Sequence, residues 1–183
     1  MRIHSYEKES GTLIVDFPGD LVNDRVHEFY DIPAHVYASL DASSNPSGYF
    51  NEKIWGNKYE KKAHWKDLNS LVHYFEEYID FEPPVKINTK RIDGDALLHV
   101  ASHWGDIGAV SLLIENGADV NAKGDMGCTP LYMAISAGHA RSAKLLLKSG
   151  ANVNDTNELG TSSYKLAMTE GNERMGELIT KFV

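Results

Sequence analysis

The side chains of this sequence that could bind a metal or attack a substrate are eight histidines and one cysteine, Cys128. His99 and His103 stand four residues apart, which is the spacing of two metal ligands on one face of a helix. No glutamate lies between them to complete the pattern of a helix-borne metalloprotease, and a single cysteine excludes a cysteine-based zinc site. Cys128 has no evident general base nearby in the sequence. We therefore predict no metal site and no catalytic residue.

The signature motifs of nucleotide-binding and hydrolytic enzymes are also missing. The sequence has no Walker loop, no Gly-x-Gly-x-x-Gly after a strand and no Gly-x-Ser-x-Gly. We expect a protein that is not an enzyme and that uses no cofactor.

A basic stretch interleaved with aromatic residues suggests an RNA-binding surface. Its members are Lys53, Lys58, Lys61, Lys62 and Lys66, together with Trp55, Tyr59 and Trp65. Lysines for phosphates and rings for bases are what an RNA-binding surface requires. The alternative is a solvated helix end whose aromatic residues belong to the core. Because residues 1–86 hold 15 acidic and 9 basic residues, we favour this alternative and do not expect a nucleic-acid partner.

The chain as a whole is acidic, with a formal net charge of -8. An acidic surface suits a basic protein partner, although plain solubility explains it as well. The first residues lack the apolar region of a secretory signal, and apolar runs such as 112–114 are far shorter than the roughly 20 residues of a membrane span. We expect a cytoplasmic protein that does not enter a membrane.

A 33-residue repeat in the second half of the chain supplies the elements that must position any binding residue. The equivalent residues are Gly94, Gly127 and Gly160; Ala101, Ala134 and Ala167; Gly105, Gly138 and Gly171; and Leu112, Leu145 and Leu178. The clearest unit reads Gly-Cys-Thr-Pro-Leu-Tyr-Met-Ala over 127–134 and Leu-Leu-Leu-Lys-Ser-Gly-Ala-Asn-Val-Asn over 145–154. This period and these motifs resemble the ankyrin-repeat family. We place three repeats at 92–124, 125–157 and 158–183.

Each residue type in the clearest unit has a physical role. Thr129 can cap a helix and Pro130 fits its first position, while Leu131 and Ala134 face the core and Gly138 suits the end of the helix. The first and third units depart from this pattern, as terminal repeats commonly do. The resemblance also gives His99 the family's histidine position, where the ring hydrogen-bonds the turn.

The segment at 63–79 predicts an amphipathic helix, because its apolar residues recur at three and four residue steps. The prolines at 83 and 84 then exclude further helix. We expect residues 63–91 to form a connecting helix and a proline-containing linker. The helix would cap the first repeat or pack on the N-terminal domain, with partner binding as the alternative.

Residues 1–62 predict a small separate domain. Strand-like runs at 13–17 and 25–30 are followed by a helix at 34–40, a turn near 45–51 and a helix at 54–59. Several short motifs in this order resemble the KTSC domain: Tyr30-Asp31-Ile32-Pro33, Tyr37-Ala38-Ser39-Leu40 and Ser47-Gly48-Tyr49-Phe50-Asn51, with Ile54 and Tyr59. The expected fold is therefore α+β, a small N-terminal α+β domain followed by an all-α ankyrin-repeat solenoid.

The ankyrin resemblance implies a partner-binding surface on the hairpin tips and on the exposed edges of the first helices. Trp104 is expected to face outward as an anchor, or alternatively to pack against the N-terminal domain. The positions implied are Ile92, Asp93, Asp95, His103, Trp104, Lys123, Asp125, Met126, Ser136, Thr156, Glu158, Leu159, Thr169 and Glu170.

Two functional hypotheses follow from these resemblances. The first is a bacterial immunity or antitoxin protein, a monomer when free, that binds and neutralises a toxin or effector, such as a basic toxin. The second is an adaptor whose KTSC-like domain contacts RNA or tRNA while the repeats hold a protein.

Overall fold

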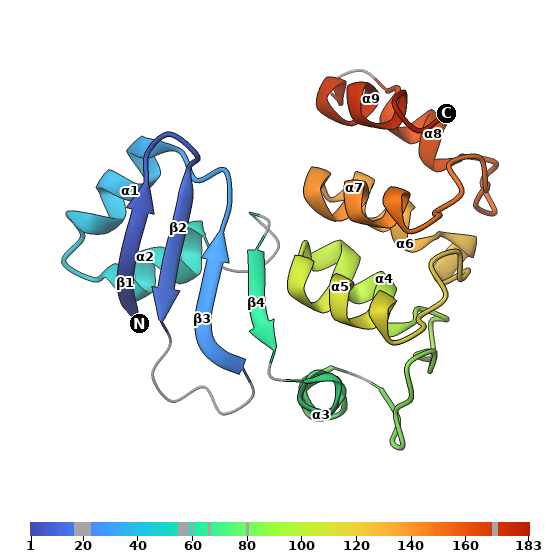
Figure 1. The fold of residues 1–183 in the computed structure, drawn as a ribbon, viewed down its shortest axis with the longest axis horizontal. Helices are drawn as coiled ribbons and strands as arrows, with labels where there is room; N and C mark the ends of the chain where they lie inside the picture. The colour runs from blue at the N-terminus through green and yellow to red at the C-terminus, as the bar shows by residue number, and fades with distance from the viewer. Residues whose placement is uncertain (17–22, 55–58, 60, 66, 80, 170–171) are drawn as a thin grey trace.

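In the computed structural model the N-terminal sheet and the helical stack lie side by side (Figure 1). The structure describes residues 1–16, 23–54, 59, 61–65, 67–79, 81–169 and 172–183. None of the helices in these ranges is long and apolar enough to cross a membrane.

The N-terminal part is a four-stranded antiparallel sheet in the order β1-β2-β3-β4. Its strands are β1 (Arg2–Glu7), β2 (Thr12–Asp16), β3 (Asn23–Phe29) and β4 (Lys61–Trp65). Leu13 pairs with Phe29, and both are fully buried together with Val15. Because side chains alternate along a strand, these residues share one face of the sheet.

Two helices add to this first core, α1 (Ala34–Asp41) and α2 (Pro46–Lys53). Leu40 and Phe50 are fully buried, and the rings of Phe29 and Phe50 meet edge to face, with centroids 5.1 Å apart. The predicted turn at 45–51 is therefore wrong: Pro46 opens a helix, since proline fits the first helical position. Most of the predicted helix at 54–59 lies outside the described residues.

Strand β4 corrects the predicted start of the next helix. Residues 61–63 pair with β3, with Lys61 opposite Phe29, so the helix α3 (Leu68–Tyr78) begins later than position 63. Asp67 caps it by accepting a hydrogen bond from the amide of Ser70 at 2.8 Å. Strand β1 was not predicted either.

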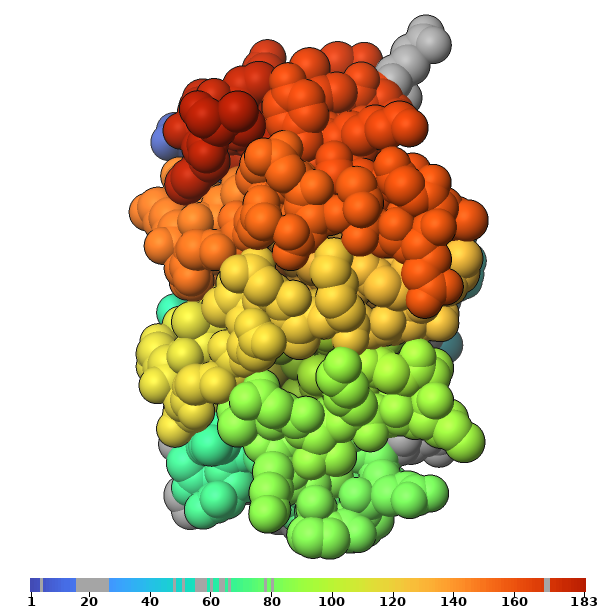
Figure 2. All heavy atoms as spheres, turned by 90° about the vertical axis from the view of Figure 1, so that its right-hand side faces the viewer, coloured from blue at the N-terminus to red at the C-terminus, as the bar shows by residue number. Residues whose placement is uncertain are grey.

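The helical part is a stack of antiparallel helix pairs. The pairs are α4 (Leu97–Trp104) with α5 (Ile107–Glu115), α6 (Pro130–Ser136) with α7 (Ala140–Lys148), and α8 (Ser163–Ala167) with α9 (Glu173–Ile179). They rise in layers from green to red in Figure 2. The predicted fold class, a small α+β domain followed by an ankyrin-type helical stack, is confirmed.

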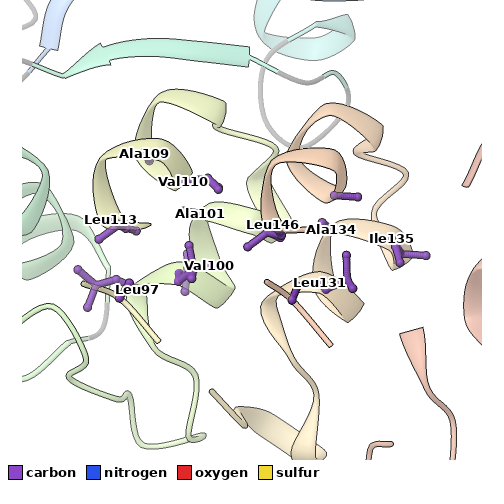
Figure 3. Packing of buried hydrophobic residues seen from close by; sticks show 14 of the residues in the cluster. Leu97, Val100, Ala101, Ala109, Val110, Leu113, Leu131, Ala134, Ile135 and Leu146 are labelled. Atoms are coloured by element: carbon purple, nitrogen blue, oxygen red, sulfur yellow. The ribbon is translucent and has the colours of Figure 1, made fainter. Parts of the chain in front are cut away.

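Equivalent small and branched residues build the second core. Ala101 and Ala134, 33 residues apart, are fully buried, as are Val110, Leu131 and Leu146, and Figure 3 shows their side chains meeting between successive helix pairs. Small alanines let neighbouring helices approach closely, which is why one unit is stable only against the next.

The expected N-terminal signals of the second unit are present. The hydroxyl of Thr129 accepts a hydrogen bond from the amide of Tyr132 at 3.2 Å, and Pro130 stands at the first helical position. Gly138 ends this helix with a φ of 81°, a conformation that favours glycine.

Candidate protein-binding surface

Three β-hairpins precede α4, α6 and α8 and extend from the stack on the side away from the sheet (Figure 1). Short antiparallel bridges close the first and the third, Lys90 with Ala96 and Thr156 with Ser162. In the second, the amide of Gly124 donates to the carbonyl of Cys128 at 2.8 Å. The three hairpins therefore form a row along one edge of the stack.

A large apolar side chain stands exposed at the tip of each hairpin. Ile92 is 102% exposed, Leu159 71% and Met126 45%. Burying such side chains against a partner is favourable, at roughly 25 cal/mol per Å² of apolar surface. We call Ile92, Met126 and Leu159 the tip row.

Hydrogen bonds to backbone atoms hold neighbouring hairpins together. Lys90 Nζ donates to the carbonyl of Lys123 at 2.7 Å, and Lys123 Nζ donates to the carbonyl of Thr156 at 3.0 Å. The amide of Glu158 also donates to the carbonyl of Met126 at 2.9 Å. Two lysines one repeat apart thus make the same contact, which fixes the tips relative to one another before a partner arrives.

His99 positions the second hairpin and closes the first turn of α4. Its Nδ1 accepts from the amide of Ala96 at 3.1 Å, and its Nε2 donates to the carbonyls of Ala122 and Cys128, both at 3.1 Å. The ring is completely buried, and burial lowers its pKa despite the nearby Asp95 carboxylate. The predicted hydrogen bonds to the turn are confirmed, and both ring nitrogens are occupied by them.

Cys128 is half-buried in the second hairpin. Burial raises the pKa of its thiol, so the unreactive thiol form is favoured over the thiolate at neutral pH. This side chain is not arranged as a nucleophile.

Most of the residues expected to contact a partner lie exposed on the hairpins or the first helices. The exposed members are Ile92, Asp93, Lys123, Asp125, Met126, Ser136, Thr156, Glu158, Leu159 and Thr169. Glu170 lies outside the described residues.

Three expected contact residues are placed differently. Trp104 is half-buried, with its ring stacked on that of Phe75 from α3 at a centroid distance of 5.8 Å. Asp95 is only 7% exposed, and its carboxylate accepts from the amide of Asp125 at 2.9 Å. His103 is half-buried, and its backbone carbonyl accepts from His139 Nε2 at 3.1 Å. Trp104 therefore belongs to the packing of α3, and the outward-facing anchor expected at this position is wrong.

Sequence reasoning missed the junction between the sheet and the stack. The Asp31 carboxylate contacts Arg141 of α7 at 2.6 Å and Arg174 of α9 at 3.0 Å. Burial raises the pKa of Asp31, but the two guanidinium groups outweigh it and lower the pKa overall. Nothing in the local sequence marks these partners, which follow Asp31 by 110 and 143 residues.

The edge of the sheet completes this junction. The amide of Lys61 in β4 donates to the carbonyl of Gly105 at 2.9 Å, and the indole of Trp65 donates to Asp106 at 3.2 Å. These contacts lie on the helical side of the stack, so the N-terminal part leaves the hairpin face uncovered (Figure 2).

This arrangement, a layered stack of helix pairs with projecting hairpins, defines a repeat protein of the ankyrin class. A family model of three copies of the ankyrin repeat matches residues 66–157, and the chain belongs to the ankyrin-repeat family. The model of the KTSC domain matches residues 1–59. No curated protein matches the sequence.

The start of the match at residue 66 includes helix α3. Val85 and Asn88, which follow α3, stand 33 residues before Ala118 and Asn121. Asn88 Oδ1 accepts from the amide of Asp119 at 3.0 Å, just as Asn121 Oδ1 accepts from that of Asn152 at 2.8 Å. Helix α3 therefore stands where the second helix of a preceding repeat would be.

Proposed function

We propose that this protein binds another protein through its tip row and, most concretely, that it is a bacterial immunity or antitoxin protein that neutralises a toxin or effector in the cytoplasm. The observation that carries the proposal is the row of three exposed apolar tips held in fixed positions by backbone hydrogen bonds. Ankyrin repeats are non-catalytic interaction modules, which supports binding as the function.

The charges of the hairpins favour a basic partner. Each tip residue has a carboxylate beside it, Asp93, Asp125 or Glu158; that of Asp93 is paired with Arg91 at 3.1 Å, so Asp125 and Glu158 carry most of the negative charge offered to a partner. Lys123, by contrast, directs its ammonium group to a backbone carbonyl. A partner surface with apolar pockets flanked by lysines or arginines would match this pattern, and complementary charge would also speed association.

The test is co-purification with the product of the neighbouring gene, followed by tip variants. The double variant Met126→Ala with Leu159→Ala removes two anchors, and anchors of this kind carry more than about 2 kcal/mol. We expect the partner's Kd to rise at least roughly thirtyfold and protection of cells to be lost.

The matched control is Val183→Ala, which also shortens an exposed apolar side chain, 76% exposed, outside the hairpins. Its Kd should stay within twofold of the unaltered protein. Unchanged binding and full protection by the double tip variant would refute the proposed surface.

A further inference from the structure

A hollow lies on the last helix pair of the stack, α8 and α9. Its volume is about 430 Å³, and its lining residues are Ala167, Met168, Thr169, Glu173, Gly176, Glu177 and Thr180. Met168 is 52% exposed there. This end of the stack is distinct from the hairpins that carry the tip row.

The 33-residue register shows what fills the equivalent place one repeat earlier. Met168 and Gly176 correspond to Ile135 and Ala143, which are 3% and 0% exposed. Those residues belong to α6 and α7, on which α8 and α9 pack. A surface of this shape therefore accommodates a helix.

Glycine in place of alanine at position 176 shapes the floor of the hollow. A Cβ built on Gly176 would lie 3.3 Å from the carbonyl oxygen of Ala167 and 3.4 Å from Met168 Sδ. The missing methyl group thus lets α8 and Met168 lie close against α9, and the flexible, half-exposed thioether of Met168 is the part of the hollow that can adapt to an incoming apolar side chain.

Two residues of the hollow differ from their equivalents in the preceding unit, and they exclude a further ankyrin repeat as the natural occupant of the hollow. Glu173 and Thr180 stand where the preceding unit has Ala140 and Leu147, which are 8% and 6% exposed. Another repeat packed here would bury a carboxylate and a hydroxyl, and burying an unpaired charge is costly.

Charge then selects among helical partners. Glu173 and Glu177 are both exposed and stand four residues apart on one face of α9, at the rim of the hollow. A second copy of this chain would bring the same carboxylates against them. A helix with lysines or arginines beside its apolar stripe would pair with them instead.

We infer that the C-terminal end of the stack is a second docking site, which takes a basic amphipathic helix from a partner protein. The apolar stripe of that helix enters the hollow beside Met168 and Gly176, and its cations face Glu173 and Glu177. This site does not depend on the tip row, so either proposal can be refuted without refuting the other.

The probe is a synthetic peptide of about 18 residues, or five helical turns, in which leucines form one face and lysines flank it. A scrambled peptide of the same composition is its control. Binding to the full chain is followed by fluorescence anisotropy and by the methyl resonances of ¹³C-labelled methionines. We expect the resonance of Met168 to shift and that of Met126 to stay in place.

The double variant Glu173→Lys with Glu177→Lys should weaken the peptide at least tenfold. The pair Glu9→Lys with Asp41→Lys, which makes the same charge change at exposed positions of the N-terminal part, should alter its Kd by less than twofold. Absence of binding, equal binding of the scrambled peptide, equal loss in both variants, or a shift at Met126 alone would each overturn the inference. Self-association of the chain that Met168→Asp abolishes would overturn it in favour of a second copy.

Discussion

Mild acid should destabilise this protein through His139. The ring is 2% exposed, donates from Nε2 to the carbonyl of His103 at 3.1 Å, and lies against Gly105. Burial lowers its pKa from 6.5 to about 4, and the nearby His103 and Lys61 add to the effect. The folded state therefore holds His139 neutral at a pH where the unfolded chain binds a proton.

The sign and size of the effect follow from proton linkage. The stabilising contribution is complete above pH 6.5 and is lost as the pH falls towards 4, because the unfolded state binds the proton first. Between pH 7 and pH 5, a histidine with these two pKa values lowers the free energy of unfolding by about 2 kcal/mol. For a chain of 183 residues, this corresponds to a fall in Tm of about 4–8 °C. His99, whose pKa burial also lowers, acts in the same direction.

Urea unfolding at pH 7, 6 and 5 measures this loss in the free energy of unfolding. These pH values lie above the range in which most carboxylates titrate. The variant His139→Asn keeps an amide that can donate to the same carbonyl but has no proton to gain. Its loss of stability between pH 7 and pH 5 should be smaller than that of the unaltered protein by about 2 kcal/mol. The control His35→Asn, at an exposed position of α1, should follow the unaltered protein. An unchanged pH dependence in His139→Asn would refute the reasoning.

Two further substitutions are tested by the same urea measurement. One changes the packing of Gly105 against His139, and the other removes the charge of Asp31 at the junction. Gly105→Ala should cost about 2 kcal/mol or more, because the residue has a φ of 64° and the new Cβ would lie 2.7 Å from the ring of His139. Gly138→Ala, with a φ of 81° and open space around it, should cost only about 1 kcal/mol, and equal costs would contradict the steric argument. Asp31→Asn keeps a residue that tolerates its φ of 59° but removes the charge that faces Arg141. Because that carboxylate is 40% exposed, the loss should stay below about 1 kcal/mol and fall further in high salt; a larger, salt-independent loss would contradict it.

The repeat was predictable because its signals are local. Thr129, Pro130 and Gly138 each act on the turn in which they stand, and the alanines recur where helices approach. The contacts of His99 were predictable from the family resemblance, because His99 stands at the histidine position of the repeat; its ring bonds Ala96 in its own unit and the carbonyls of Ala122 and Cys128 further along the chain.

Apart from the turn at 45–51, where the local helix signal of Pro46 was overlooked, the errors have a different physical origin, since each depends on a segment distant in the chain. The helix was predicted to begin at 63, but strand β4 pairs with β3 and removes residues 63–65 from it. Trp104 packs on α3, and Asp31 pairs with arginines more than 100 residues away. Tertiary contacts of this kind override local propensity. The hollow on α8 and α9 was missed because Glu173 and Thr180 are notable only when they are compared with Ala140 and Leu147, their equivalents in the preceding unit.

The packing of helix α5 along the edge strand β4 has a consequence for solubility. An edge strand offers free backbone amides and carbonyls to the strands of other molecules, which is a common start of aggregation. Helix α5 lies along β4, and the amide of Lys61 is already bonded to Gly105. Among the described strands the opposite edge is β1, whose pairing is irregular between Ile3 and Ser5, and such irregularity hinders the regular addition of strands. Attachment to the repeats thus shields the sheet from self-assembly, a protection that the isolated N-terminal domain would lose.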